Sequence, residues 1–169
     1  KETKLNLELI ILGDGKNEFI RNIKNVIYFG KVNYNMIKLI LINSDYLILP
    51  SSVEGLPFTV LEAMSLGIPC ICSNINGINE LINHENGFLF DLNNYHKYKN
   101  NIDNWKILDD YELNYDYNMN SLFKIIKDAY SIDIDRWNNL SNNSYNIIKQ
   151  NYDKEYVDKY NYLSFNLFL

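Results

Sequence analysis

This sequence has few prolines and histidines, and it has no excess of positive charge. Its 169 residues include three prolines and two histidines, and 21 acidic residues against 16 Lys and Arg give a formal net charge of −5. Because binding to a nucleic-acid backbone needs clustered Lys and Arg, this balance argues against nucleic acid as the main partner. Binding of a small anionic ligand remains compatible with this charge, since a helix N-terminus and one or two cations can hold phosphate groups.

The sequence also lacks a long apolar run. Apolar stretches such as residues 37–42, which include Lys38, and 46–50 are far shorter than the ~20 residues of a membrane-spanning helix. They are also too short for the apolar centre of a signal peptide. The two cysteines, Cys70 and Cys72, lie in another short apolar run, and we expect them to point to opposite faces of a strand and to remain free. Two free, buried thiols fit a reducing compartment, so the sequence predicts a cytoplasmic protein.

Up to about residue 91, short apolar stretches alternate with amphipathic ones. Strands are predicted over residues 7–12, 25–29, 46–49, 68–72 and 87–90. Helices are predicted over residues 16–24, 34–44, 58–66 and 78–82, with Gly67 just past the third, where a C-terminal glycine belongs. Strands that are apolar throughout and alternate with helices indicate a parallel sheet covered on both faces. The predicted fold class is therefore α/β, with a Rossmann-like core over residues 5–91.

The character of the chain changes after this core. Residues 92–120 are polar, rich in Asn, Asp and Tyr, and are interpreted as an insertion. Residues 121–169 are interpreted as C-terminal helices, over residues 121–130, 135–151 and 153–169. Asp133 and Asp135 match the Asp-x-Asp pattern of metal sites, but they precede a helix and are predicted to cap it. With no internal repeat and no Gly/Ser linker, residues 1–169 are predicted to form one domain.

Residues 50–64 are the most informative stretch for function. They leave the end of a buried strand, make a Gly/Pro turn and enter a helix. Ligands of open parallel sheets bind beyond the carboxyl ends of the strands, and a helix N-terminus offers unpaired N–H groups and partial positive charge to an anion. Pro57 has no N–H, so the free donors are predicted to be the amides of Phe58, Thr59 and Val60, helped by the Thr59 hydroxyl.

Two carboxylates flank this predicted anion site. Glu54 lies in the loop before the helix and Glu62 lies about one turn inside it. A carboxylate can accept hydrogen bonds from two adjacent hydroxyls of a ribose or hexose. One acid on each side of a phosphate site suits a sugar–diphosphate–ribose ligand. Each acid alone also has a structural interpretation, Glu62 as a residue that stabilises the helix dipole and Glu54 as a solvated loop residue.

The same stretch resembles the E-x7-E motif of family-4 glycosyltransferases, with Glu54 and Glu62 as its two acids. Other landmarks of that family follow in the expected order over residues 7–91. They are LGDG at 12–15, VIYFG at 26–30, SDYLILPS at 44–51, EAMSLGIP at 62–69 and NGFLF at 86–90. The resemblance implies the C-terminal, nucleotide-sugar-binding half of a GT-B-fold retaining glycosyltransferase.

The resemblance also implies roles for individual residues. Glu54 would hold the sugar and Glu62 the ribose, as the two catalytic-site acids. Gly30, Lys31 and Val32 would form the edge that binds the base. The other residues expected around the donor are Gly13, Gly55, Leu56, Phe58, Thr59 and Val60.

The implied activity is transfer of a hexosyl group from a UDP-sugar to a glycan or lipid acceptor with retention, in cell-surface polysaccharide or glycolipid synthesis. No metal and no cofactor are expected. Family members carry an Arg and a Lys on an earlier strand and helix, and an N-terminal acceptor domain. We therefore expect both upstream in the same polypeptide, and expect the 169 residues alone to be inactive. The full-length protein could associate peripherally with a membrane. Two alternatives stay open, a non-catalytic nucleotide-sugar-binding module and a GT-B-type sugar-nucleotide epimerase.

Overall fold

A computed structural model describes residues 5–14, 23–93 and 118–152 of the chain. The chain divides into two compact units, Lys1–Ser44 and Asp45–Leu169. The predicted helix at 153–169, nearly all of the one at 16–24 and most of the insertion lie outside the described residues.

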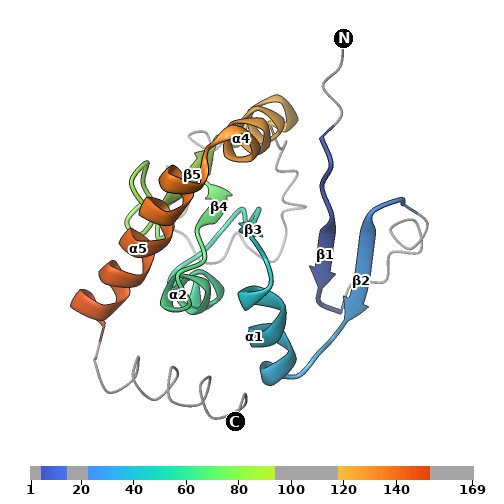
Figure 1. Ribbon diagram of the computed structural model, residues 1–169, viewed down its shortest axis with the longest axis horizontal. Coiled ribbons are helices and arrows are strands. Elements are labelled where there is room, and N and C mark those ends of the chain that lie inside the picture. The colour runs from blue at the N-terminus through green and yellow to red at the C-terminus, as the bar shows by residue number, and fades with distance from the viewer. Residues whose placement is uncertain (1–4, 15–22, 94–117, 153–169) are drawn as a thin grey trace, which may run out of the picture. The chain divides into compact units, whose positions relative to one another are not determined.

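In the first unit, the described residues form two strands and one helix (Figure 1). Strands β1 (Leu9–Leu12) and β2 (Val26–Gly30) pair in parallel, with an irregularity in register near the end of β1. Helix α1 (Tyr34–Ile42) begins where the Asn33 side chain accepts a hydrogen bond from the Met36 amide at 3.0 Å. Asn is a favoured N-cap residue for this reason. The structure confirms these three elements to within about two residues at each end.

The second unit is built on a three-stranded parallel sheet. Its strands are β3 (Leu47–Leu49), β4 (Cys70–Ser73) and β5 (Gly87–Phe90), in that order across the sheet. All four residues of the central strand β4 are buried. Because both strand pairs are parallel, the carboxyl ends of the three strands lie at one edge of the sheet.

The described residues of this unit also form the helices α2 (Phe58–Ser65), α4 (Met119–Ser131) and α5 (Ile134–Asn151). Helix α2 packs against β3, β4 and α5, while α4 packs against β5 (Figure 1). The shared core is made of side chains that are almost completely buried, namely Val60, Ala63, Met64, Ile71, Ile78, Ile82, Phe90 and Leu140. Parallel sheets with flanking helices confirm the predicted α/β, Rossmann-like class.

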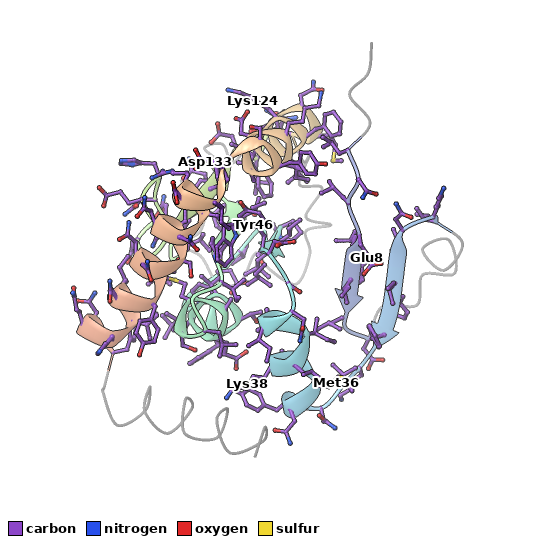
Figure 2. All side chains as sticks on the ribbon, viewed as in Figure 1. Glu8, Met36, Lys38, Tyr46, Lys124 and Asp133 are labelled. Carbon is purple, nitrogen blue, oxygen red and sulfur yellow. The ribbon has the colours of Figure 1, made fainter. Side chains whose placement is uncertain are left out.

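Hydrogen bonds from aromatic side chains connect the C-terminal helices to the start of β3. The Tyr46 hydroxyl, labelled in Figure 2, donates to the Ala129 carbonyl at 3.0 Å, and its ring meets Phe88 edge to face. Burial and, to a smaller extent, the charge of Asp45 raise the pKa of Tyr46 to about 12. The Trp137 indole N–H donates to the Asp45 carbonyl at 3.1 Å. These two bonds fix the C-terminal helices to the segment that leads into β3.

Helix α5 begins and is anchored by specific polar contacts. The Asp133 carboxylate accepts from the Arg136 amide at 2.8 Å (Asp133 is labelled in Figure 2). This confirms the predicted capping role of Asp133. Further along the helix, the buried Ser144 hydroxyl donates to the Asn86 carbonyl at 2.8 Å. Helix α5 is therefore bonded directly to the turn that precedes β5.

Helix α2 ends in the predicted glycine. Gly67 has φ +70°, its amide donates to Met64, and the Ile68 amide donates to Ala63, both at 2.9 Å. This pair of bonds is the Schellman arrangement, in which a left-handed residue closes the helix. A Cβ on Gly67 would also lie 3.0 Å from the Ser141 hydroxyl of α5. Glycine at this position therefore serves both the turn and the close approach of α5.

The short helix predicted over residues 78–82 is wrong. Residues 76–81 form consecutive turns, in which the Ile78 and Asn79 amides donate to Ile75. The Leu81 carbonyl, which a continuing helix would use, instead accepts from the Asn86 side chain at 2.7 Å. This bond from five residues further along the chain replaces the helical one, and the helical pattern stops after one turn.

The two cysteines share a face of β4, contrary to the expectation that they point to opposite faces. Side chains two residues apart on a strand project to the same side. A hydrogen bond with Cys72, followed by burial, raises the pKa of the Cys70 thiol well above its ordinary value. Both cysteines are buried and free.

Among the helices of the described residues, none combines the length and the apolar character that crossing a membrane requires.

The closeness of β4 and β5 predicts that Gly87→Ala destabilises the second unit. A Cβ on Gly87 would lie 2.5 Å from the Cys70 carbonyl and 3.0 Å from the Ile82 side chain. Overpacking of this kind costs roughly 1–3 kcal/mol. Urea unfolding should show this loss, whereas Gly55→Ala, where a Cβ meets nothing within 4 Å, should change stability by less than ~0.5 kcal/mol. Equal stabilities of the two variants would contradict the close approach.

Candidate functional site

The candidate site lies at the edge of the three-stranded sheet where its strands end. The loop of residues 50–57 follows β3, residues 74–77 follow β4, and Asp91 follows β5. Two of these segments are joined, because the Asn74 side chain donates to the Asp91 carboxylate at 3.0 Å and the Asn74 amide donates to Phe90 at 2.8 Å. The edge predicted for ligand binding in a parallel sheet therefore carries polar groups from all three strands.

The start of α2 leaves backbone donors at this edge. Pro57 is the N-cap, and its carbonyl accepts from the Val60 amide at 2.9 Å and the Leu61 amide at 3.1 Å. Within the described part of the chain, the amides of Phe58 and Thr59 have no hydrogen-bond partner. Both residues are exposed, so these two amides are donors suited to an anion.

The amide of Val60 differs from the other two predicted donors. It is occupied by the bond to Pro57, and the Val60 side chain is fully buried in the core. The expectation of a third free amide at Val60 was therefore wrong. The physical reason is that the first turn of α2 is tight, so the Pro57 carbonyl, three residues before Val60, accepts the Val60 amide.

Glu54 is half-buried in the loop before α2 and is held by a neighbouring side chain. The Ser51 hydroxyl donates to Glu54 Oε1 at 2.7 Å. The buried Ser73 hydroxyl, at the end of β4, in turn donates to the Ser51 carbonyl at 2.5 Å. Sequence reasoning missed both serines. A Ser three residues before a Glu is a weak local signal, and the contact from Ser73 spans 22 residues and has none.

Glu62 lies half-buried on α2, four residues after Phe58 and three after Thr59. Residues at this spacing share a helix face, and helical side chains lean toward the N-terminus. This general geometry predicts that the Glu62 side chain extends toward the turn that carries the two unpaired amides. Burial raises the pKa of Glu62 above its ordinary value, so its ionised form lacks the solvation of a free carboxylate.

Gly55 and Leu56 complete the loop and are both exposed. The backbone beneath them is in close contact with Gly77, which has φ +82°. A Cβ on Gly77 would lie 2.5 Å from the Gly55 carbonyl and 3.0 Å from the Glu54 carbonyl. In the sequence, this position is marked by Asn76-Gly77, a turn dipeptide placed just after a strand. The sequence alone gives no sign that this turn contacts the loop before α2.

The remaining predicted residues lie in the first unit. Gly13, just after β1, and Gly30, the last residue of β2, lie next to each other, since the Gly13 amide donates to the Gly30 carbonyl at 3.0 Å. The Tyr28 hydroxyl donates to the Gly13 carbonyl at 2.8 Å. Lys31, exposed, and Val32, half-buried, come directly after Gly30. The structure thus brings these four residues to the carboxyl edge of the two-stranded sheet.

Comparison with known proteins identifies the family. Residues 1–121 match the family model described as "Glycosyl transferases group 1". The chain belongs to this family. Among its relatives are an Escherichia coli UDP-Gal:alpha-D-GlcNAc-diphosphoundecaprenol alpha-1,3-galactosyltransferase, 37% identical over 62% of this chain and 29% of that protein, and a Bacillus anthracis N-acetyl-alpha-D-glucosaminyl L-malate synthase, 31% identical over 53% of this chain and 26% of that protein. The chain spans less than a third of the length of these relatives.

The fold of this glycosyltransferase chain has solved counterparts. Anabaena HepE in complex with UDP-glucose matches 90% of this chain and 38% of its own, with a TM-score of 0.57 and 18% identity. HepE has also been solved in complex with UDP, with a TM-score of 0.56 and 17% identity over 95% of this chain and 41% of its own. This likeness supports the GT-B architecture.

The burial of Glu62 predicts a pH-dependent effect of Glu62→Gln on stability. A raised pKa means that the ionised Glu62 destabilises the fold, with a cost absent below the ordinary Glu pKa of ~4.3 and complete above the raised one. Glu62→Gln should therefore raise Tm at pH 7 by on the order of 1–2 °C, a small shift because solvent still reaches the carboxylate. Thermal melts near pH 4 should give nearly equal Tm values. A lower Tm for the variant at pH 7, or an equal gain at both pH values, would contradict this account.

Proposed function

We propose that this chain binds the donor of a retaining hexosyltransferase, a UDP-sugar, at the edge where β3 is followed by α2. One observation carries the proposal. Two exposed backbone amides, those of Phe58 and Thr59, lack partners in the described residues, and carboxylates lie before them at Glu54 and after them at Glu62. The amides suit the diphosphate and the carboxylates suit the hydroxyl groups on either side of it.

In this proposal Glu62 binds the ribose and Glu54 binds the hexose. Glu62 lies inside the helix, beyond the amides, and its half-buried carboxylate gains most from donors that replace lost water. Glu54 lies in the loop, where Ser51 occupies one of its oxygens. Its other oxygen is left for sugar hydroxyls. The E-x7-E motif is the sequence pattern that corresponds to this arrangement. In the proposal both acids contact the donor and therefore belong to the catalytic site.

The reaction breaks the bond between the anomeric carbon and the diphosphate and forms a bond from that carbon to an acceptor hydroxyl on the same face. The Phe58 and Thr59 amides stabilise the charge that develops on the departing diphosphate, aided by the dipole of α2. The acceptor proton passes to a phosphate oxygen of the donor. In this scheme the chain's own residues bind and orient the donor and stabilise its leaving group.

The names of similar proteins support a UDP-sugar as donor. One relative is a UDP-galactose-dependent transferase acting on a diphosphoundecaprenol-linked sugar, and HepE has been solved with UDP-glucose. We infer a glycan or lipid acceptor, used in cell-surface polysaccharide or glycolipid synthesis. An N-terminal domain of the same polypeptide would bind that acceptor at the cytoplasmic face of the membrane.

The order of groups along the donor predicts different effects for the two acids. Glu62→Ala should weaken binding of UDP itself, whereas Glu54→Ala should spare UDP and weaken only the intact UDP-sugar. A hydrogen bond to a charged group contributes about 1.5–3 kcal/mol, so each loss should be about tenfold or more. NMR titrations of both variants with UDP, UDP-glucose and UDP-galactose measure these differences.

A suitable control is Glu85→Ala, because Glu85 is an exposed acid in the turn before β5, at the edge of the sheet where the strands begin and not where they end. It should leave all three affinities unchanged. Equal weakening of UDP by both substitutions would mean that the two roles are assigned wrongly. No effect of either substitution would mean that Glu54 and Glu62 serve only the loop and the helix. Hydrolysis or epimerisation of a UDP-sugar without acceptor would favour an epimerase instead.

A further inference from the structure

The hydrogen bond from Ser51 to Glu54 leads beyond the two acids themselves. In the described residues it is the one hydrogen bond made by the Glu54 carboxylate, with 2.7 Å between Ser51 Oγ and Glu54 Oε1. An ionised carboxylate accepts about four hydrogen bonds. Ser51 therefore occupies one acceptor position and leaves Glu54 Oε2 to be directed elsewhere. The bond also selects one orientation of a side chain that otherwise has several rotamers.

Ser51 is itself fixed from the sheet. The Ser73 hydroxyl is fully buried at the end of β4 and donates to the Ser51 carbonyl at 2.5 Å. On the next segment, Gly77 lies so near the Glu54 and Gly55 carbonyls that a Cβ would come within 2.5 Å of Gly55. The loop backbone is thus bonded to β4 on one side and packed against the 74–77 turn on the other.

We propose that Ser51 is a positioning residue for sugar recognition, which acts by holding the Glu54 carboxylate in its binding orientation before the donor arrives. The inference rests on the proposed role of Glu54 in contacting the hexose. Its physical basis is preorganisation, because a carboxylate that is already oriented loses less freedom when a ligand binds. Ser51 acts through Glu54, so removing its hydroxyl should affect the sugar and not the nucleoside diphosphate.

The test compares Ser51→Ala with Ser51→Thr, which keeps the hydroxyl. The ligand is UDP-glucose or UDP-galactose, whichever the wild-type protein binds more tightly than UDP. Ser51→Ala should weaken its binding by roughly three- to tenfold, the loss expected for one hydrogen bond. Ser51→Thr should return that affinity to within about twofold of wild type. The affinity ratio of UDP-sugar to UDP is the readout, because a general loss of structure would weaken both ligands together.

Ser52→Ala is the matched control, since Ser52 is the neighbouring half-buried serine and should leave the ratio unchanged. A double-mutant cycle completes the test: in a Glu54→Ala background, Ser51→Ala should have no further effect on the ratio. If Glu54→Ala lowers the ratio and Ser51→Ala does not, the proposed function stands and this inference is overturned. If Glu54→Ala leaves the ratio unchanged, both fall. Independent effects of the two substitutions would also overturn the positioning role.

Discussion

Pro57 determines where α2 begins, and the candidate site depends on that position. Proline has no N–H and a fixed φ, and the Pro57 carbonyl accepts the first two bonds of the helix, from Val60 and Leu61. The helix therefore starts with two amides, at Phe58 and Thr59, that no carbonyl of the described residues uses. A side-chain cap bonds the second or third amide of a helix, and α2 has no such cap to compete for the Thr59 amide.

The same part of the structure contains two groups in environments that do not favour folding. The Glu62 carboxylate is half-buried with a raised pKa, and Phe58, a large apolar residue, is 64% exposed at the start of the helix. Neither feature improves folding. The surrounding structure compensates with fully buried residues on the opposite side of α2, Val60, Ala63 and Met64, and with the glycine that closes the helix. Groups in unfavourable environments on a well-packed element are typical of binding sites.

Local patterns in the sequence predicted most of the elements but not the contacts that hold the loop. Apolar runs, Pro57 and Gly67 identified β3, α2 and β4, since each signal acts within a few residues. The helix predicted over 78–82 failed because Asn86, from beyond the segment, takes the Leu81 carbonyl. The bond between Ser73 and Ser51 and the approach of Gly77 to Gly55 likewise join segments about 22 residues apart. Such contacts depend on the parallel register of β3 and β4, which a single sequence does not specify.

The central claim is that the first two amides of α2 bind the diphosphate of the donor. An amide-detected NMR titration of the chain with UDP tests it directly, with uridine as the matched ligand that lacks phosphate. The account predicts that UDP shifts the Phe58 and Thr59 amide resonances strongly, shifts Val60 less because its N–H is already bonded to Pro57, and that uridine leaves all three nearly unchanged. UDP binding that leaves Phe58 and Thr59 unmoved, or equal shifts with uridine, would contradict it.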